Sequence, residues 1–433
     1  MSDPAAVAEV RRVLTSTVAA ERLRIVASLI RRTRDWELSE DVVQDAVARA
    51  LATWPQRGIP DNPGAWLTTA AKNAAVDALR RAETERRTAG RAAIEAELDL
   101  DGQPSLTSSE TGDGSIDDDR LRLIFTCCHP ALPLEARIAL TLRTVAGLEV
   151  AEIARAFLVT EAAMQKRLVR ARAKIREAGI PYRVPASEQL PARTQDVLAV
   201  LWLLFTEGYS GGAGLVRVPL ADEAIRLGRL LATLMAATPL QPEVLGLLSL
   251  MLFQHSRRAT RVDVAGDLIL LEDQDRAQWD TAMIGDGIAA LAASESVRRR
   301  RDGVIGPYRL QAEIAREHAT ASSAETTDFR RIAELYARLA RVAPSPVIEV
   351  NRAVAIALAE GPAAGLAVLD ALDDARLSGY HLLPAARADL LRRAGKDAEA
   401  LSEYERALAL APSEPERRFL ARRISALRSA EGS

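Results

Sequence analysis

Apolar residues between Gly147 and Arg176 recur at steps of three and four, and this spacing predicts two short amphipathic helices joined by a tight turn. The apolar face of the first helix consists of Val150, Ile153, Ala154 and Phe157. The pattern stops at Leu158, and Thr160 is expected to cap the second helix by accepting a hydrogen bond from a free backbone N–H. The buried stripe of the second helix consists of Met164, Leu168, Ala171 and Ile175.

The outer face of the second helix is strongly basic. It carries Gln165, Lys166, Arg167, Arg170, Arg172, Lys174 and Arg176, against one acidic residue, Glu161. Such a face favours a helix that docks beside phosphates. Two helices joined by a turn, the second of them basic, are typical of a DNA-binding helix-turn-helix. A basic, solvated helix in an ordinary helical bundle is the alternative.

Helical periodicity also marks the first part of the chain. Residues 1–36 are expected to form two helical pieces, and a further helix is expected over 38–54 with Ser39 as its N-cap. The inward face of that helix is predicted to contain Val43, Val47, Ala50, Leu51 and Trp54. Its outer face then carries Asp41, Gln44, Asp45 and Arg49, which on their own describe a solvated surface.

Another helix is predicted to begin at Asn62-Pro63, because Asn is a good cap and Pro is tolerated in the first helical turn. Its inward positions are Leu67, Ala71, Ala74 or Ala75, and Ala78. Its polar stripe consists of Thr69, Lys72, Asn73, Asp77, Arg80 and Arg81, with Trp66 near the start. A stripe of this kind can hold a phosphate backbone and stack on an unpaired base, or it can be a solvated helix surface.

Charge is segregated along a chain whose net charge is only −2 at pH 7. Glu95 to Asp119 holds nine acidic residues and no basic one, whereas Arg120 to Arg183 holds twelve basic and five acidic residues. The basic charge therefore belongs to the predicted helix-turn-helix part. The acidic residues lie in a stretch rich in Ser, Thr and Gly, about residues 90–119, which predicts a flexible linker.

Several classes of site are not expected. The N-terminus lacks the apolar core of a signal peptide and no apolar run approaches the ~20 residues of a membrane span, so a cytoplasmic protein is expected. Cys127, Cys128 and His129 lack the spacing of a structural zinc site, and buried thiols are expected there. The loop at 207–214 lacks the Lys and Ser/Thr of a P-loop, and residues 279–288 are expected to form a packing turn. We therefore expect no metal, no cofactor and no enzyme.

The stretches LSEDVVQDAVARAL and NPGAWLTTAAKNAAVDALRR, followed by the acidic linker and the helix-turn-helix, resemble an extracytoplasmic-function sigma factor of the sigma-70 family over about residues 8–180. The resemblance implies an all-α protein that binds core RNA polymerase and promoter DNA and directs transcription initiation. Its first domain, 1–89, would engage core polymerase and the −10 element, and its second, 120–185, the −35 element. The linker, 90–119, would be either a negatively charged strand in the polymerase cleft, as in relatives, or a plain tether.

The resemblance also implies roles for individual residues. Those facing the clamp helices of the polymerase would be Asp41, Gln44 and Asp45. Those along the melted −10 element would be Trp66, Lys72, Asn73, Asp77, Arg80 and Arg81. Those at the −35 major groove would be Gln165, Lys166, Arg167 and Arg170. The sequence departs from the family pattern at Glu149, Ala163 and Gln165, so promoter preference is not carried over.

The long C-terminal part, 186–433, contains a repeat. Residues 334–346 align with 402–414 at an offset of 68, which is twice the 34-residue period of a tetratricopeptide repeat, and Gly361 and Gly395 are 34 apart at predicted bends. This spacing predicts helix pairs that stack into a solenoid with a binding surface. The chain is similar in this to the sigma factors that carry a long, tetratricopeptide-like extension. The extension would bind a partner protein or regulate the sigma domains of its own chain, by inhibition or by activation.

Two other functions are compatible with the residues. One is an adaptor whose repeats scaffold other proteins beside a degenerate sigma-like half, and the other is a conventional helix-turn-helix regulator that acts without polymerase. Retention of the basic stripe over 161–176 and of the Asp41, Gln44 and Asp45 face argues against the adaptor. Tight promoter binding by the isolated protein would favour the conventional regulator.

Overall fold

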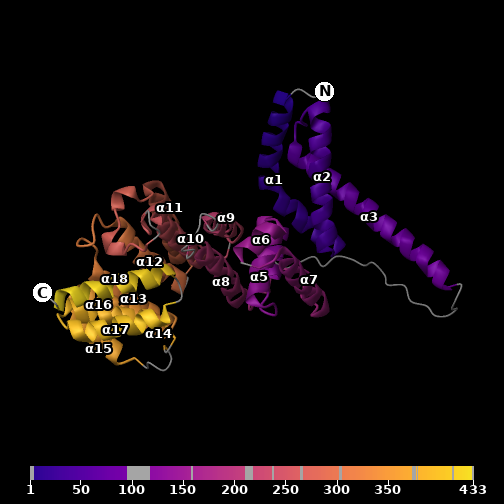
Figure 1. Cartoon of the computed structure of the whole chain (residues 1–433). Helices are drawn as coiled ribbons and strands as arrows, with labels where there is room; N and C mark the ends of the chain where they lie inside the picture. Colours follow the sequence, from indigo (N-terminus) through magenta and orange to yellow (C-terminus); the bar gives the residue numbers. More distant parts are fainter. Residues whose placement is uncertain are drawn as a thin grey trace. The chain divides into compact units, whose positions relative to one another are not determined.

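The computed structural model describes residues 4–94, 118–157, 159–209, 218–236, 238–263, 267–301, 305–372, 377, 379–411 and 414–431 (Figure 1). All regular elements within these ranges are helices, apart from one isolated bridge between Val262 and Leu268. The predicted all-α fold class is therefore confirmed. The chain divides into two compact units, Met1–Val200 and Leu201–Ser433.

The first unit contains the elements predicted from the two N-terminal patterns. Its helices are α1 (Pro4–Thr33), α2 (Trp36–Arg57), α3 (Pro63–Ile94), α4 (Asp119–Cys127), α5 (Leu134–Leu140), the π-helical turn η1 (Thr141–Ala146), α6 (Val150–Ala156) and α7 (Glu161–Glu177). Helix α8 (Leu190–Tyr209) begins in this unit. Helix α1 packs against both α2 and α3, and also against α4.

The expectation of two helical pieces over residues 1–36 is wrong, because α1 is a single helix from Pro4 to Thr33. Residues 5–33 contain neither Gly nor Pro, so nothing in the local sequence interrupts the backbone hydrogen bonds of the helix. The helix ends where Arg34 adopts the left-handed conformation, with φ of 54°. A short-range break in apolar spacing therefore does not mark a helix end here.

The start of α2 also differs from the prediction. Asp35 caps the helix by accepting a hydrogen bond from the Leu38 N–H at 3.0 Å, and Ser39 lies inside the first turns, where its hydroxyl donates to the Asp35 carbonyl at 2.5 Å. The predicted inward face is rotated as well. Val43, Ala50 and Trp54 are buried as expected, but Val47 is only half-buried and Leu51 is 43% exposed. The buried face of α2 is Trp36, Ser39, Glu40, Val42, Val43, Ala46, Ala50 and Trp54.

Helix α3 begins as predicted. The Asn62 side chain accepts a hydrogen bond from the Ala65 N–H at 2.9 Å, and Pro63 is the first helical residue. The inward positions Leu67, Ala71, Ala74 and Ala75 are buried, while Ala78 is half-buried. The ring of Trp66 meets that of Trp54 edge-on at 5.4 Å between centroids, which ties the start of α3 to the end of α2.

The predicted helix-turn-helix is confirmed in α6 and α7. Thr160 accepts a hydrogen bond from the Ala163 N–H at 3.2 Å, and the predicted stripe Met164, Leu168, Ala171 and Ile175 is buried. Ahead of it, the segment with Pro130 and Pro133 separates α4 from α5. Both cysteines are buried near the end of α4, and burial raises the pKa of the Cys128 thiol to about 11. No cluster of metal-ligating side chains occurs among the residues that the structure describes.

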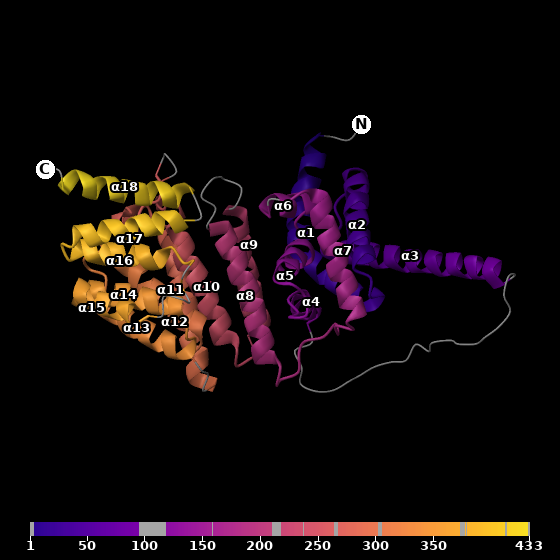
Figure 2. The same cartoon turned by 60° about the horizontal axis from the view of Figure 1, so that its bottom comes forward.

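The second unit is built from consecutive helices that pack on their neighbours (Figure 2). They are α9 (Val218–Leu234), α10 (Gln241–Ser256), α11 (Thr281–Arg301), α12 (Pro307–Thr320), α13 (Phe329–Val342), α14 (Pro346–Glu360), α15 (Pro362–Asp370), α16 (Leu382–Arg393), α17 (Asp397–Leu410) and α18 (Glu414–Glu431), with short 3-10 turns η2 (Arg258–Thr260), η3 (Leu271–Asp273) and η4 (Arg276–Gln278). The packing turn expected at residues 279–288 is wrong, because Thr281–Ile288 form the first turns of α11, where Gly287 packs against the Phe253 ring of α10.

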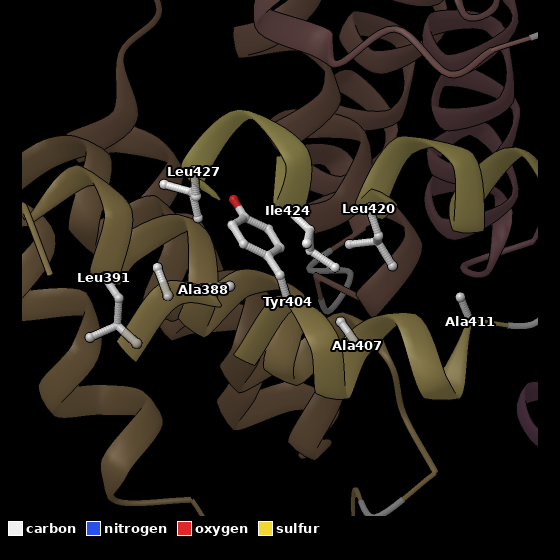
Figure 3. Close-up of a cluster of buried hydrophobic side chains, with 9 residues drawn as sticks. Ala388, Leu391, Tyr404, Ala407, Ala411, Leu420, Ile424 and Leu427 are labelled. Atoms are coloured by element: carbon white, nitrogen blue, oxygen red, sulfur yellow. The ribbon is translucent and has the colours of Figure 1, made fainter. Parts of the chain in front are cut away.

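The expected bends at Gly361 and Gly395 are confirmed. Gly361, with φ of 104°, joins α14 to α15, and Gly395, with φ of 74°, joins α16 to α17. Only glycine adopts such angles without strain. In the core of the last helices, Tyr404 and Ala407 of α17 pack against Leu420, Ile424 and Leu427 of α18 (Figure 3).

Two predicted segments fall largely outside the described residues. The linker at 90–119 is described only at its ends, where α3 continues to Ile94 and Asp118 caps α4. The glycine loop at 207–214 is described only to the last turn of α8.

Gly365 is where α15 approaches α14 most closely. A Cβ atom there would lie 2.5 Å from the Ala357 Cβ and 2.6 Å from the Ala353 carbonyl oxygen, and neither atom can move easily. We expect Gly365→Ala to lower the stability of the second unit by about 1–3 kcal/mol. The measurement is calorimetric unfolding of the full chain.

The matched control for this substitution is Gly285→Ala in α11, since a Cβ there meets nothing within 4 Å. It should stabilise the same unit by about 0.5–1 kcal/mol through helix propensity. Equal unfolding temperatures for the two variants would contradict the packing described at Gly365.

Candidate functional site

The residues expected to meet core polymerase form one exposed face of α2. Asp41, Gln44 and Asp45 are all exposed and are spaced by three and four residues, so they project on the same side. Partial burial raises the pKa of Asp41, and the neighbouring carboxylates of Glu37, Glu40 and Asp45 raise it further. The face is therefore acidic and suited to a basic partner.

The residues expected to meet the −10 element lie along α3. Lys72, Asn73, Asp77, Arg80 and Arg81 are exposed on this helix. Within the described part of the chain, the Arg81 side chain is the one among them with a hydrogen bond, which Nε donates to the Asp77 carbonyl at 3.3 Å. At 1.5 Å per residue, the stretch from Trp66 to Arg81 is about 22 Å long. Trp66 is half-buried because its ring packs on Trp54, so it combines a structural contact with a partly exposed aromatic surface.

The residues expected to meet the −35 element divide into two groups on α7. Gln165, Lys166 and Arg170 are exposed, and no side-chain hydrogen bond or ion pair joins them to other described residues. Arg167 is different: its Nη2 lies 3.0 Å from Glu135 Oε2 on α5, and its guanidinium lies over the Phe157 ring at 5.6 Å. Arg167 therefore supports the packing of α7, in addition to any contact with DNA.

A groove runs between the first residues of α5 and the basic side of α7. Its volume is about 770 Å³, and its basic lining comes from Lys166, Arg167, Arg170 and Lys174. Pro133 and Ala136 lie on the opposite wall. Lys166, Arg170 and Lys174 follow one another at steps of four, so their cationic ends line one side of the groove. A row of cationic side chains of this kind can contact a phosphate backbone.

Sequence reasoning missed a polar network centred on Glu40. This side chain is only 4% exposed, and its carboxylate accepts hydrogen bonds from Thr144 Oγ1 at 2.9 Å, Arg143 Nε at 3.2 Å and Arg172 Nη2 at 2.9 Å. One signal was available in the sequence. Glu40 precedes Val43, a predicted inward residue, by three positions, so both lie on the same face of α2. An unpaired charge at such an inward position would be unfavourable.

Comparison with known proteins follows the same division of the chain. Residues 17–85 match sigma-70 region 2, residues 122–175 match sigma-70 region 4, and residues 193–295 match a family of unknown function, DUF6596. The chain is 42% identical over 407 residues to the uncharacterized protein R00370 of Rhizobium meliloti (strain 1021), covering 93% of each. The chain belongs to the family of R00370. Its two sigma-70 regions support an RNA polymerase sigma factor.

Region 2 thus lies within α1, α2 and α3, and region 4 within α4 to α7. The DUF6596 match covers nearly all of α8 and runs into α11. No solved structure matches the chain. None of the helices in the described ranges has the length and apolar character that a membrane span requires.

Arg167 and Arg170 provide a matched pair on α7 of region 4. We expect Arg167→Ala to lower the free energy of unfolding of the first unit by about 1 kcal/mol, because it removes a partly exposed ion pair and a cation–π contact. Arg170→Ala should leave stability unchanged, since its side chain is exposed and unpaired within the described residues. Urea unfolding of both full-length variants makes the comparison. An equal loss of stability in the two would contradict the structural role of Arg167.

Proposed function

We propose that the protein is a sigma factor of the extracytoplasmic-function class, which binds core RNA polymerase and directs initiation at specific promoters. The observation that carries the proposal is the presence of sigma-70 regions 2 and 4 in this order, with all of their expected residues exposed except the half-buried Trp66 and Arg167. The protein itself performs no chemistry in this proposal, since the polymerase makes the RNA. It acts in the cytoplasm, where the polymerase is.

In this proposal the domain at 1–89 binds the polymerase clamp through the acidic face of Asp41, Gln44 and Asp45. Its helix α3 holds the melted −10 strand through Lys72, Asn73, Asp77, Arg80 and Arg81, with Trp66 available for stacking on a base. The support is the exposure of these polar side chains on their helices. Stacking on an aromatic ring contributes about 1–3 kcal/mol per base.

The domain at 120–185 binds the −35 element through α7. Lys166 and Arg170 contact phosphates or base edges from the wall of the groove, and Gln165 lies beside them on the exposed side of the helix. Arg167 contributes less to DNA binding than its charge suggests, because Glu135 already neutralises it. The residues between the domains, 90–119, connect them.

The remaining residues, 186–433, form a tetratricopeptide-like extension that regulates the sigma domains or binds a partner. Support comes from the 34-residue spacing of the bends at Gly361 and Gly395 and from the paired helices around them. A truncation that tests this role must keep the start of α8. Arg193 of α8 donates to the Phe125 carbonyl at 2.6 Å and Asp196 pairs with Arg137 at 3.4 Å, so the start of α8 stabilises α4 and α5.

Reversing charge on the acidic face of α2 should weaken polymerase binding. We expect Asp45→Arg to lower the affinity of the full chain for bacterial core polymerase by about tenfold, because a like charge would meet a basic partner surface. Fluorescence anisotropy with labelled protein measures the affinity. The control is Asp61→Arg, an exposed acidic residue in the turn after α2, which should bind like the wild type. Equal affinities for both variants would remove the acidic face from the proposal.

Truncation after Tyr209 should preserve α8 and its contacts with α4 and α5 while removing the second unit beyond this helix. In vitro transcription with core polymerase on a library of promoter-like DNA compares this form with the full chain. We expect specific transcripts from at least one form, and a several-fold difference in yield between the two. Transcripts of equal yield would contradict regulation by the extension. If both forms are folded and neither binds core polymerase, the result contradicts the sigma-factor proposal and favours the adaptor.

A further inference from the structure

The loop that follows η2 contains a short stretch that is acidic at its ends and apolar between them. Residues 267–273 have the sequence DLILLED, and we call this stretch the strap. Its first residues pair with those before them: Leu268 bridges Val262, and the Ile269 N–H donates to the Arg261 carbonyl at 2.9 Å. The start of the strap is therefore extended, like a strand.

The acidic ends of the strap bind the last helices of the second unit. Arg418 Nε of α18 donates to Asp267 Oδ1 at 2.5 Å, and Arg422 of the same helix donates to Asp267 Oδ2. Arg393, the last residue of α16, donates from Nη2 to both Glu272 carboxylate oxygens at 2.9 Å. The strap thus joins two helices from which it is separated by 121 to 155 residues of sequence.

The apolar part of the strap faces a groove on α18. The groove has a volume of about 420 Å³, with Leu268 and Leu270 on the strap side and Phe419, Arg423 and Ala426 on the helix side. The core side of α18 points to α17 instead (Figure 3). The four apolar residues of the strap are only half-buried, so the strap does not fill the groove beside it.

The flank after the strap is fixed independently of the groove. Gln274 Nε2 donates to the Ile269 carbonyl at 3.1 Å. Arg276 Nη1 donates to the His318 and Ala321 carbonyls at 2.5 and 2.9 Å, at the C-terminal end of α12. These bonds keep the strap near the groove even when its own side chains release α16 and α18.

The contacts of the strap with the groove are individually weak. The arginines that hold Asp267 have side chains 41% and 51% exposed, and exposed ion pairs contribute little and are screened by salt. A tethered segment stays bound through such contacts because its effective concentration is high. A free segment of the same chemistry can therefore replace the strap when it makes slightly better contacts.

We propose that the groove between α18 and the end of α16 is a docking site for an extended acidic segment of a partner protein, and that the strap is its built-in occupant in the free chain. The partner places one carboxylate between Arg418 and Arg422, a second at Arg393, and apolar side chains between them against Phe419. This inference rests on the proposed partner-binding role of the extension and names the chemistry of the partner.

A fluorescein-labelled peptide with the sequence of residues 267–275 is the probe, and fluorescence anisotropy measures its affinity for the full chain. In the wild-type chain the strap competes with the peptide. Asp267→Asn weakens the strap and leaves the arginines of the groove in place. We expect this variant to bind the peptide about tenfold more tightly than the wild type, since the apparent dissociation constant falls as the competent fraction rises. Circular dichroism checks that each variant is folded.

Charge substitutions test whether the peptide occupies the groove. A peptide that carries Asp267→Asn and Glu272→Gln should lose binding at least tenfold. Arg422→Glu, added to the Asp267→Asn chain, should also abolish binding, whereas Arg341→Glu, at an exposed arginine in the last turn of α13, should not. A peptide with Asp267→Lys should recover binding to the Arg422→Glu chain, which a merely unfolded variant would not allow.

Three results would overturn the docking site. One is equal peptide affinity of the wild-type and Asp267→Asn chains. Another is equal affinity of the Arg422→Glu and Arg341→Glu variants. The third is a dimer of the wild-type chain in sedimentation velocity that Asp267→Asn abolishes, because the groove would then serve a second copy of the chain.

The readout involves no polymerase, so it separates the docking site from the sigma-factor proposal. Peptide binding as expected, without core binding by any form, would contradict the sigma-factor proposal and leave the docking site. Promoter-specific transcription without peptide binding by the Asp267→Asn chain would contradict the docking site alone.

Discussion

The first unit depends on the way one buried carboxylate is neutralised. A carboxylate removed from water loses several kcal/mol of hydration free energy unless it gains well-placed donors. Glu40 gains two guanidinium groups and a hydroxyl, each supplied by a segment more than a hundred residues away in the sequence. The packing of α2 against the helix-turn-helix part is therefore conditional: it is favourable while these donors are present and unfavourable once they are withdrawn.

Elements whose signals are local were predicted well. The caps Asn62 and Thr160 and the buried stripe of α7 all follow from residues within one or two turns of each other. The start of α2 failed for an equally local reason. Asp35 and Ser39 are both good caps, and the earlier one prevails because helix extension to Trp36 buries that indole, which is 6% exposed. Single-turn signals could not decide between the two.

Site residues were predictable only as far as exposure follows from helical periodicity. The period alone places Asp41, Gln44 and Asp45 outside, and it does the same for Lys166 and Arg170. Arg167 has the same local pattern, but its environment is set by Glu135, which precedes it by several helical elements. The environments of Glu40 and Arg172 are likewise set by the ion pair between them. Pairings of this kind depend on tertiary packing, which a one-dimensional pattern does not contain.

The basic face of α7 therefore consists of two groups of cationic side chains. Arg167 and Arg172 are held by Glu135 and Glu40, while Lys166, Arg170, Lys174 and Arg176 have no ion pair within the described part of the chain. A phosphate backbone that attracts α7 also competes with Glu40 for Arg172. Since coupling between two binding equilibria is reciprocal, any ligand that binds Arg172 must weaken the Arg172–Glu40 pair as much as that pair weakens binding of the ligand.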